Sequence, residues 1–459
     1  MIQHQLEARI SRMLSDFDRM LPAHREPAEL FMCAPDGTRI PLQNGALWGE
    51  ELWQNFEVFL RVPPAPKGRR NYLYLTTGRE GQWDACNPQF EARINGKLRQ
   101  AFDVNHIRMP LDESGDVCIE LKGYCCNSEM KLLRPFVRAE LCQINTELEQ
   151  LSYDIRIPYE AAMLLPAGER ERELTLEIIA SAIDLLDLRI PHSAAFDAGI
   201  AEARRYLKEN YYDPREGIPP IAVADCVGHT HIDIAWLWDI EQSRHKAVRS
   251  FSTVCDLMER YPDYRFMSSQ PILYEFVKQD EPELYARIKQ RVAEGRWEVE
   301  GGMWVEADCN ISGGESLARQ FFYGQRFFAE EFGKRCRVLW LPDVFGYSAA
   351  LPQMMQLSGI DYFMTTKISW NEYNQMPYDT FIWKGIDGTG ILTHFPPTRD
   401  YYSTNIGEGY HRHSDHNTTY TSVMNPSEIA GGWKRFMQKG LDDHFLVLYG
   451  YGDGGGGPT

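Results

Sequence analysis

The stretch IAVADCVGHTHIDIAWLWD (221–239) decides how the second half of this chain folds. Its first seven residues form an apolar run with the length of a short buried strand. Three side chains that can bind a metal follow at alternate positions: His229, His231 and Asp233. Alternate side chains of an extended chain point to the same side. Zinc takes imidazole nitrogen and carboxylate oxygen at about 2.0–2.2 Å, and manganese, cobalt and calcium are other candidates for such a set. The stretch therefore predicts a buried strand that ends at a metal site.

Short apolar runs and amphipathic segments alternate through the rest of the chain. Such alternation predicts a parallel sheet with right-handed crossover connections. Seven to eight strands in this length favour a β/α barrel-like domain; an open doubly wound sheet is the alternative, although no GxGxxG turn supports it. The expected strands are 221–227, 264–269, 297–302, 337–341, 362–366, 380–385, 391–395 and 445–450, and helices are expected near 244–261, 273–294, 315–331 and 350–358.

The first half of the chain has a different pattern. Residues 1–21 have apolar side chains at helical spacing, which predicts a docking helix. Runs of period two follow, and Asn95-Gly96 between two of them predicts a hairpin within a β-sandwich. Helical periodicity then returns. We therefore expect a multidomain α/β protein with a helical leader at 1–47, a β-sandwich at 48–145, a helical segment and linker at 146–218, and the barrel-like domain at 219–459.

Composition limits the partners and the compartment. The formal net charge of −17 argues against nucleic acid or an anionic membrane surface as partner. No run of 18 apolar residues is present, so no membrane span is expected. The ten cysteines include the adjacent pair Cys125-Cys126 and no CxxC pattern, which predicts reduced thiols in a cytoplasmic protein. A homo-oligomer is compatible with the sequence.

Polar residues follow the ends of six expected strands. In parallel α/β folds the carboxyl ends of the strands carry the functional groups, so these residues are expected to converge on one rim. Glu306 and Asp308 are two apart and share a side, and spacing alone does not choose between them. Besides the first cluster, the set contains Gln270, Trp304, Glu306, Asp308, Asp343, Lys367 and Asp453.

The last of these residues lies in YGYGDGGGGPT (449–459). Four consecutive glycines allow the backbone to approach a ligand closely, although a flexible loop would have the same composition. The GK[ST] ending of a phosphate-binding loop is absent. Asp453 is the only ionisable side chain in the run.

Six motifs, given at the end of this paragraph in their order along the chain, resemble those of family 38 of the glycoside hydrolases, the zinc α-mannosidases. The resemblance is strongest to the cytosolic and bacterial branch of that family. The resemblance covers most of 221–459 and extends more weakly over 48–212. It implies a β-sandwich, then an α/β barrel of about seven strands, then further domains, so this chain is expected to be an N-terminal fragment without the C-terminal domains. The motifs are GHTHIDIAWLW, GGMWVEADCNISGGESLARQ, LWLPDVFGYSAALPQMM, FMTTKISWNEYN, FIWKGIDGTGILTHFPP and GYGDGGGGPT.

The resemblance also implies roles for individual residues. His231, Asp233 and Asp308 are expected to bind one zinc ion per chain, with His229 supporting these ligands. A further zinc-binding histidine is expected beyond Thr459, because no remaining histidine lies in a matching motif. The histidines without such a motif are His394, His411, His413, His416 and His444.

The implied reaction is retaining hydrolysis of terminal α-linked mannose from oligosaccharides through a covalent mannosyl-aspartate. Asp308 is expected to be the nucleophile, which settles the choice against Glu306 by resemblance, and Asp453 the acid/base. The residues expected to line the substrate pocket are Trp236, Trp304, Asp343, Phe345 and Lys367.

Two other functions compete with this one. A metal-dependent amide or ester hydrolase could use a similar barrel, but such sites take further histidines from later strand ends, where this chain has Asp and Lys. The other is a non-catalytic carbohydrate-binding fragment, which the expected truncation would produce.

Overall fold

The computed structural model describes residues 3–49, 51–80, 88–125, 134–136, 138–371, 373–402 and 417–459. Cys126 and the histidines at 411, 413 and 416 lie outside the described residues. The eight cysteines within them are all free, as the reduced-thiol prediction requires. No helix in the described ranges has both the length and the apolar character needed to cross a membrane.

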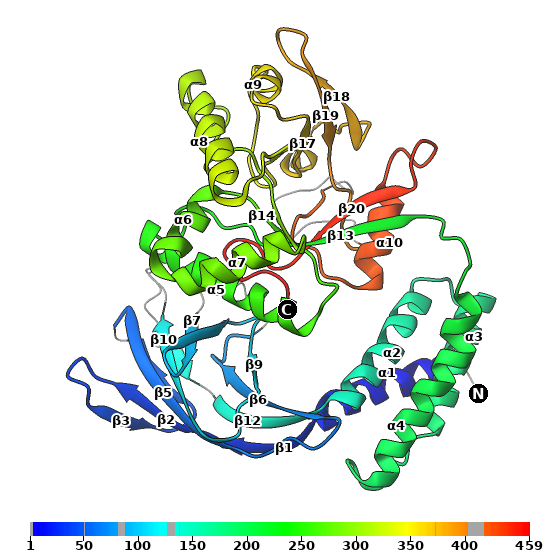
Figure 1. Ribbon diagram of the computed structural model, residues 1–459. Coiled ribbons are helices and arrows are strands. Elements are labelled where there is room, and N and C mark those ends of the chain that lie inside the picture. Colours follow the sequence, from blue (N-terminus) through cyan, green and yellow to red (C-terminus); the bar gives the residue numbers. More distant parts are fainter. Residues whose placement is uncertain are drawn as a thin grey trace.

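Two antiparallel sheets near the N-terminus face each other across one apolar core (Figure 1). One sheet has the order β1-β12-β6-β9 and the other β3-β2-β5-β10-β7-β8. Leu73, Leu141 and Met109 of the first sheet pack against Phe56 and Ile119 of the second. A separate two-stranded sheet pairs β4 (Ala46–Trp48) with β11 (Arg134–Phe136). The strands of the two larger sheets are β1 (Pro22–Pro27), β2 (Glu29–Cys33), β3 (Arg39–Leu42), β5 (Trp53–Val62), β6 (Arg69–Thr76), β7 (Gln89–Ile94), β8 (Lys97–Phe102), β9 (Arg108–Leu111), β10 (Gly115–Tyr124) and β12 (Arg138–Asn145).

The Asn95-Gly96 hairpin forms as predicted. Both residues have positive φ, 53° and 73°, and they join β7 to β8 directly. This turn matches the right-handed twist of the strands it connects. Strands β1 to β3 lie inside the stretch 1–47, so this part of the chain contains sheet as well as the expected helix.

Four helices pack around a second core. They are α1 (Gln3–Met20), α2 (Thr146–Met163), α3 (Arg170–Asp184) and α4 (Ala194–Leu207), followed by the short turns η1 (Lys208–Tyr212) and η2 (Asp213–Arg215). Ile10 and Phe17 of α1 pack with Ile155, Ile179 and Phe196 from the other three. The N-terminal helix therefore docks on α2 to α4, as its periodicity predicted.

The second half of the chain contains two four-stranded sheets. The order β15-β14-β13-β20 is wholly parallel, whereas in β16-β17-β19-β18 the edge strand β18 is antiparallel. Every expected strand is present: β13 (Val223–His229), β14 (Phe266–Ser268), β15 (Trp297–Val299), β16 (Val338–Trp340), β17 (Tyr362–Met364), β18 (Thr380–Lys384), β19 (Gly390–His394) and β20 (His444–Tyr449).

The predicted barrel does not close among the described residues. An isolated parallel bridge between Gly301 and Leu339 joins the two sheets at one side. At the other side β18 folds back through the turn at Gly388 and takes the free edge of β19, so β19 and β20 do not pair within the described chain. The architecture is therefore two linked sheets in a multidomain α/β protein.

Helices cover these sheets (Figure 1). They are α5 (Ile240–Arg260), α6 (Pro271–Asp280), α7 (Pro282–Ala293), α8 (Gly314–Phe332), α9 (Leu351–Leu357) and α10 (Pro426–Arg435), with the short turn η3 (Lys367–Trp370). Helix α5 also contacts the sandwich, where Nδ1 of His245 lies 2.6 Å from Oε1 of Glu91 and Gln242 donates to Gln89 at 2.8 Å. One helix thus connects the N-terminal sheets to the sheets that carry the metal-type residues.

Candidate active site

The loop after β13 brings the predicted metal-type residues together. His231, Asp233 and Asp453 each offer a ligand atom, and these atoms lie within 4.8 Å of one another. His231 is buried, at 3% exposed. Asp453 comes from the glycine-rich loop more than two hundred residues away, so convergence of strand ends places the cluster.

Three carboxylates surround the His231 ring, and Glu306 lies nearest to it. Its Oε2 lies 2.8 Å from Nδ1, while Nε2 faces Oδ1 of Asp233 at 3.4 Å and Oδ2 of Asp343 at 3.6 Å. Burial opposes a charge on this ring, but the Glu306 carboxylate, followed by Asp233, raises the pKa of His231 well above its usual value. Neither Nδ1 nor Nε2 has the geometry of a hydrogen bond to a described residue. A buried imidazole nitrogen that faces two carboxylates is a suitable ligand set for a divalent cation.

Hydrogen bonds hold Glu306 in this place. Ser269 donates to its Oε1 at 2.6 Å, and Gln270 accepts its backbone N–H at 3.1 Å. The side chain of Gln270 also donates to the carbonyl of Ile232 at 2.9 Å, which ties the second strand end to the first. Gln270 itself has left-handed backbone, with φ of 61°. The expected rim residue Gln270 therefore aligns the loops that carry His231 and Glu306.

Asp308 makes only local contacts in the described structure. It is exposed, and its Oδ1 accepts the backbone N–H groups of Asn310 at 3.0 Å and Ile311 at 2.7 Å. It is not part of the cluster at His231, where Glu306 lies instead. The second oxygen of Asp308 takes no part in this turn.

Asp343 and Lys367 form an ion pair beside the cluster. Nζ of Lys367 lies 2.7 Å from Oδ1 of Asp343 and 4.1 Å from the centre of the Trp370 ring. The ring of Phe345, 5.4 Å from the same Nζ, is 76% exposed. An exposed aromatic next to a charged pair can stack on a sugar ring while the charges bind its hydroxyls.

Tyr420 holds the Asp453 carboxylate. Its hydroxyl donates to Oδ1 at 2.9 Å, and its ring lies 5.4 Å from that of His231. Burial raises the pKa of Asp453, although His231 and this hydrogen bond lower it. No sequence signal identified Tyr420, because it lies in the connection between β19 and α10, outside any expected strand end. A carboxyl group with a raised pKa suits proton donation near neutral pH.

His229 lies two positions before His231 and stays neutral. Trp340 donates its indole N–H to Nε2 at 3.2 Å. Burial, helped by the nearby His231, lowers the pKa of His229 to about 3. The expected role of His229 in supporting the metal ligands stays a prediction.

Two predicted pocket residues make different contacts. The ring of Trp304 packs edge-on against Phe327, 5.7 Å away, at the margin of the apolar core. Trp236 is 49% exposed and lies edge-on to Trp238, 5.6 Å away. Trp236 therefore offers a surface for a ligand, and Trp304 is partly used in packing.

Comparisons with known proteins identify the family of this chain. The family model "Glycosyl hydrolases family 38 N-terminal domain" matches residues 222–459. "Alpha-mannosidase G" of Dictyostelium discoideum is 46% identical over 233 residues, 51% of this chain and 20% of that protein. Human "Alpha-mannosidase 2C1" is 37% identical over 438 residues, 91% of this chain and 39% of that protein.

A yeast relative and a solved structure were also compared with this chain. The "Alpha-mannosidase" of Saccharomyces cerevisiae is 36% identical over 332 residues, 70% of this chain and 28% of that protein. A solved alpha-mannosidase from Enterococcus faecalis V583 aligns with a TM-score of 0.38 and 20% identity, over 50% of this chain and 25% of that one. The chain thus spans less than half the length of these relatives. Because the family model covers more than half of its residues, the chain belongs to family 38 of the glycosyl hydrolases.

Proposed function

We propose that this chain carries the catalytic centre of a retaining, zinc-dependent α-mannosidase that removes terminal α-linked mannose from oligosaccharides. The observation that carries the proposal is the His231 arrangement. Glu306 lies at Nδ1, Asp233 and Asp343 lie at Nε2, and Asp453 belongs to the same group of potential ligands. Family membership and relatives named as α-mannosidases support the same reaction.

His231 and Asp233 would hold the metal, with Asp308 as a third ligand by resemblance. When bound, the ion would bind and orient adjacent sugar hydroxyls. The group of potential ligands that the described residues bring together contains one histidine, His231, with Asp233 and Asp453. Glu306 would keep the His231 ring in the tautomer that leaves Nε2 free.

The two-step reaction would use Asp308 and Asp453. A carboxylate oxygen of Asp308 attacks the anomeric carbon and forms a mannosyl ester, while the carboxyl group of Asp453 gives its proton to the departing glycosidic oxygen. Asp453 then takes a proton from water, which attacks the same carbon and releases mannose with its configuration retained. Lys367, Asp343, Phe345 and Trp236 would bind the sugar.

The Oδ1 contacts of Asp308 with the next turn are compatible with this role. They orient the carboxylate and leave Oδ2 for attack.

Zinc content and hydrolysis of an aryl α-mannoside test the proposal together, on this chain and on Asp308→Asn. We expect stoichiometric zinc in the wild-type chain and a loss of turnover by about 10³-fold or more in the variant. Asp387→Asn, on an exposed turn, is the matched control and should keep full activity. Zinc bound without any turnover would favour the carbohydrate-binding alternative, and a folded chain that binds no zinc would overturn the metal assignment.

A further inference from the structure

A buried charged turn lies in the sandwich between β8 and β9. Asp103 accepts the backbone N–H groups of Asn105 at 2.7 Å and His106 at 2.8 Å, and the Nδ1 of His106 at 3.0 Å. The side chains of Asp103 and His106 are 3% and 5% exposed. One carboxylate therefore shapes the turn and fixes the imidazole ring at once.

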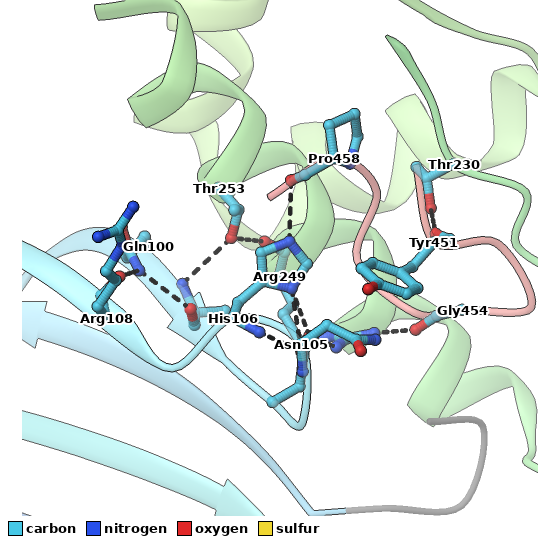
Figure 2. Close-up of polar contacts among 12 residues, drawn as sticks. Gln100, Asn105, His106, Arg108, Thr230, Arg249, Thr253, Tyr451, Gly454 and Pro458 are labelled. Atoms are coloured by element: carbon cyan, nitrogen blue, oxygen red, sulfur yellow. Dashed lines mark hydrogen bonds and ion pairs between the residues drawn. The ribbon is translucent and has the colours of Figure 1, made fainter. Parts of the chain in front are cut away.

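This turn reaches the glycine-rich loop that carries Asp453 (Figure 2). Nε2 of His106 lies 2.9 Å from the carbonyl oxygen of Pro458. Arg249 of α5 donates one N–H to Asp103 and another to the carbonyl oxygen of Gly454. Two charged side chains thus bind the loop backbone, His106 of the sandwich at Pro458 and Arg249 of α5 at Gly454, and Asp103 contacts both of them.

The contact is too close for any residue but glycine. A Cβ at Gly456 would lie 2.9 Å from both Oδ2 of Asp103 and Cε1 of His106, and its φ is +93°. A Cβ at Gly454, with φ of +75°, would lie 2.7 Å from Lys246. The sequence left open whether these glycines allow close approach to a ligand or form a flexible loop. In the structure, Gly454 and Gly456 allow the backbone to pack closely against this turn and α5.

The opposite side of the loop contacts the candidate active site. The N–H of Gly454 donates to the carbonyl of His231 at 2.9 Å, and Thr230 donates to the carbonyl of Tyr451 at 3.1 Å. Asp453 lies between these anchors with φ of 51°, a strained value for a residue with a side chain. Such a conformation persists only where the surroundings hold it.

We propose that Asp103, His106 and Arg249 are positioning residues through which the β-sandwich sets the place of the Asp453 carboxyl group. The inference rests on the proposed function, in which Asp453 is the proton donor. None of the three is among the residues that gather at His231; they act through the backbone of Gly454 and Pro458. Both nitrogens of His106 face oxygen acceptors, so the ring binds in its doubly protonated form.

The alternative is a purely structural role, in which the network only joins the sandwich to α5. A second pair at the same interface provides a control for this alternative. Glu91 of β7 pairs with His245 of α5 across the same interface, and its side chain is 7% exposed. Among the described residues, these two side chains contact each other, Arg93, Lys122 and Trp53, and none of these belongs to the glycine-rich loop. Glu91→Gln removes one buried carboxylate at this interface, as Asp103→Asn does, without touching the loop.

The test compares the zinc-loaded wild-type chain, Asp103→Asn and Glu91→Gln on two substrates. Phenyl α-mannoside needs its leaving oxygen protonated, whereas 2,4-dinitrophenyl α-mannoside does not. We expect Asp103→Asn to lower kcat on the phenyl substrate about tenfold or more and to change the dinitrophenyl rate little, with KM nearly constant. Glu91→Gln should leave the ratio of the two rates at the wild-type value.

Hydrogen exchange of the Gly454–Gly457 amides provides a readout independent of activity. We expect faster exchange there in Asp103→Asn and wild-type exchange in Glu91→Gln. An unchanged rate ratio together with unchanged exchange would overturn the inference. If the wild-type chain hydrolyses neither substrate, the proposed function fails, and exchange alone decides whether the network holds the loop. His106→Asn is the second variant if Asp103→Asn does not fold.

Discussion

Nδ1 of His231 lies 2.8 Å from Oε2 of Glu306, and both side chains are 4% exposed. This pair leaves Nε2 directed at the carboxylates of Asp233 and Asp343. A carboxylate at the second ring nitrogen of a metal-binding histidine sets the tautomer and basicity of the ring. Glu306→Gln should therefore weaken zinc binding by about 10–100-fold. Competition with a zinc chelator would measure the change.

Glu300→Gln is the control for that prediction. Glu300 is also a poorly exposed carboxylate of the same segment, but it accepts the backbone N–H groups of Arg337 and Val338. We expect a loss of stability in this variant and zinc affinity within about twofold of wild type. Equal weakening of zinc binding in both variants would contradict the role given to Glu306.

His106 makes stability depend on pH in a defined direction. Burial opposes its charge, but the Asp103 carboxylate outweighs burial and raises the pKa of His106. The folded chain then holds the proton more tightly than the unfolded chain, where the pKa is about 6.5. The contribution is fully present below that value and is lost as pH rises through the folded-state pKa.

The measurement for His106 is urea unfolding as a function of pH. The free energy of unfolding of the wild-type chain should fall as pH rises above about 6.5, and the difference from His106→Gln should shrink over the same range. A difference that stays constant with pH would show that the ring is not protonated in the folded chain.

Gly456→Ala should destabilise the chain by about 2–4 kcal/mol, because a left-handed backbone and a close approach to Asp103 both oppose a side chain. Gly37→Ala shares the positive φ, +85°, but nothing lies within 4 Å of its Cβ. The control should lose only about 1–2 kcal/mol. Chemical unfolding measures both, and equal losses would mean that the loop moves away from the sandwich at little cost.

Phe345→Ala should raise KM for an aryl α-mannoside about three- to tenfold while the melting temperature stays unchanged. The ring is 76% exposed, so its removal costs the core nothing, yet it lies beside the Lys367–Asp343 pair. Leu441→Ala is the control, because this side chain is 85% exposed and lies outside the six sequence motifs. An unchanged KM in Phe345→Ala would remove this ring from the sugar-binding surface.

Local pattern was sufficient to predict most of the elements. Strands β13 to β20 were found because each is a short apolar run bounded by turn residues, and the Asn95-Gly96 turn was found because few residues accept its backbone angles. Helix α10 was missed, since the adjacent Gly431 and Gly432 weaken its helical signal. Closure of the barrel was not confirmed, because edge pairing by β18 depends on tertiary contacts.

The candidate site was predictable in part. The position of residues after strand ends, together with resemblance, pointed to His231, Asp233 and Asp453, which the structure brings together. The pairing of Glu306 with His231 could not be read from spacing, because Asp308 shares its side of the chain. Tyr420, and the contact of Asp103 with Arg249, join segments distant in sequence and leave no local pattern. The bounds of the four expected domains, the individual catalytic roles and the cytoplasmic location remain predictions.

The matched family domain begins at residue 222, whereas Asp103 and His106 lie more than a hundred residues earlier. A protein trimmed to that domain would keep every candidate catalytic residue but expose Arg249 and one wall of the glycine-rich loop to water. The domain defined by sequence similarity is therefore shorter than the structural unit that holds the glycine-rich loop, which includes the β-sandwich. Transplanting this domain onto another scaffold would require a substitute surface with a carboxylate opposite Arg249.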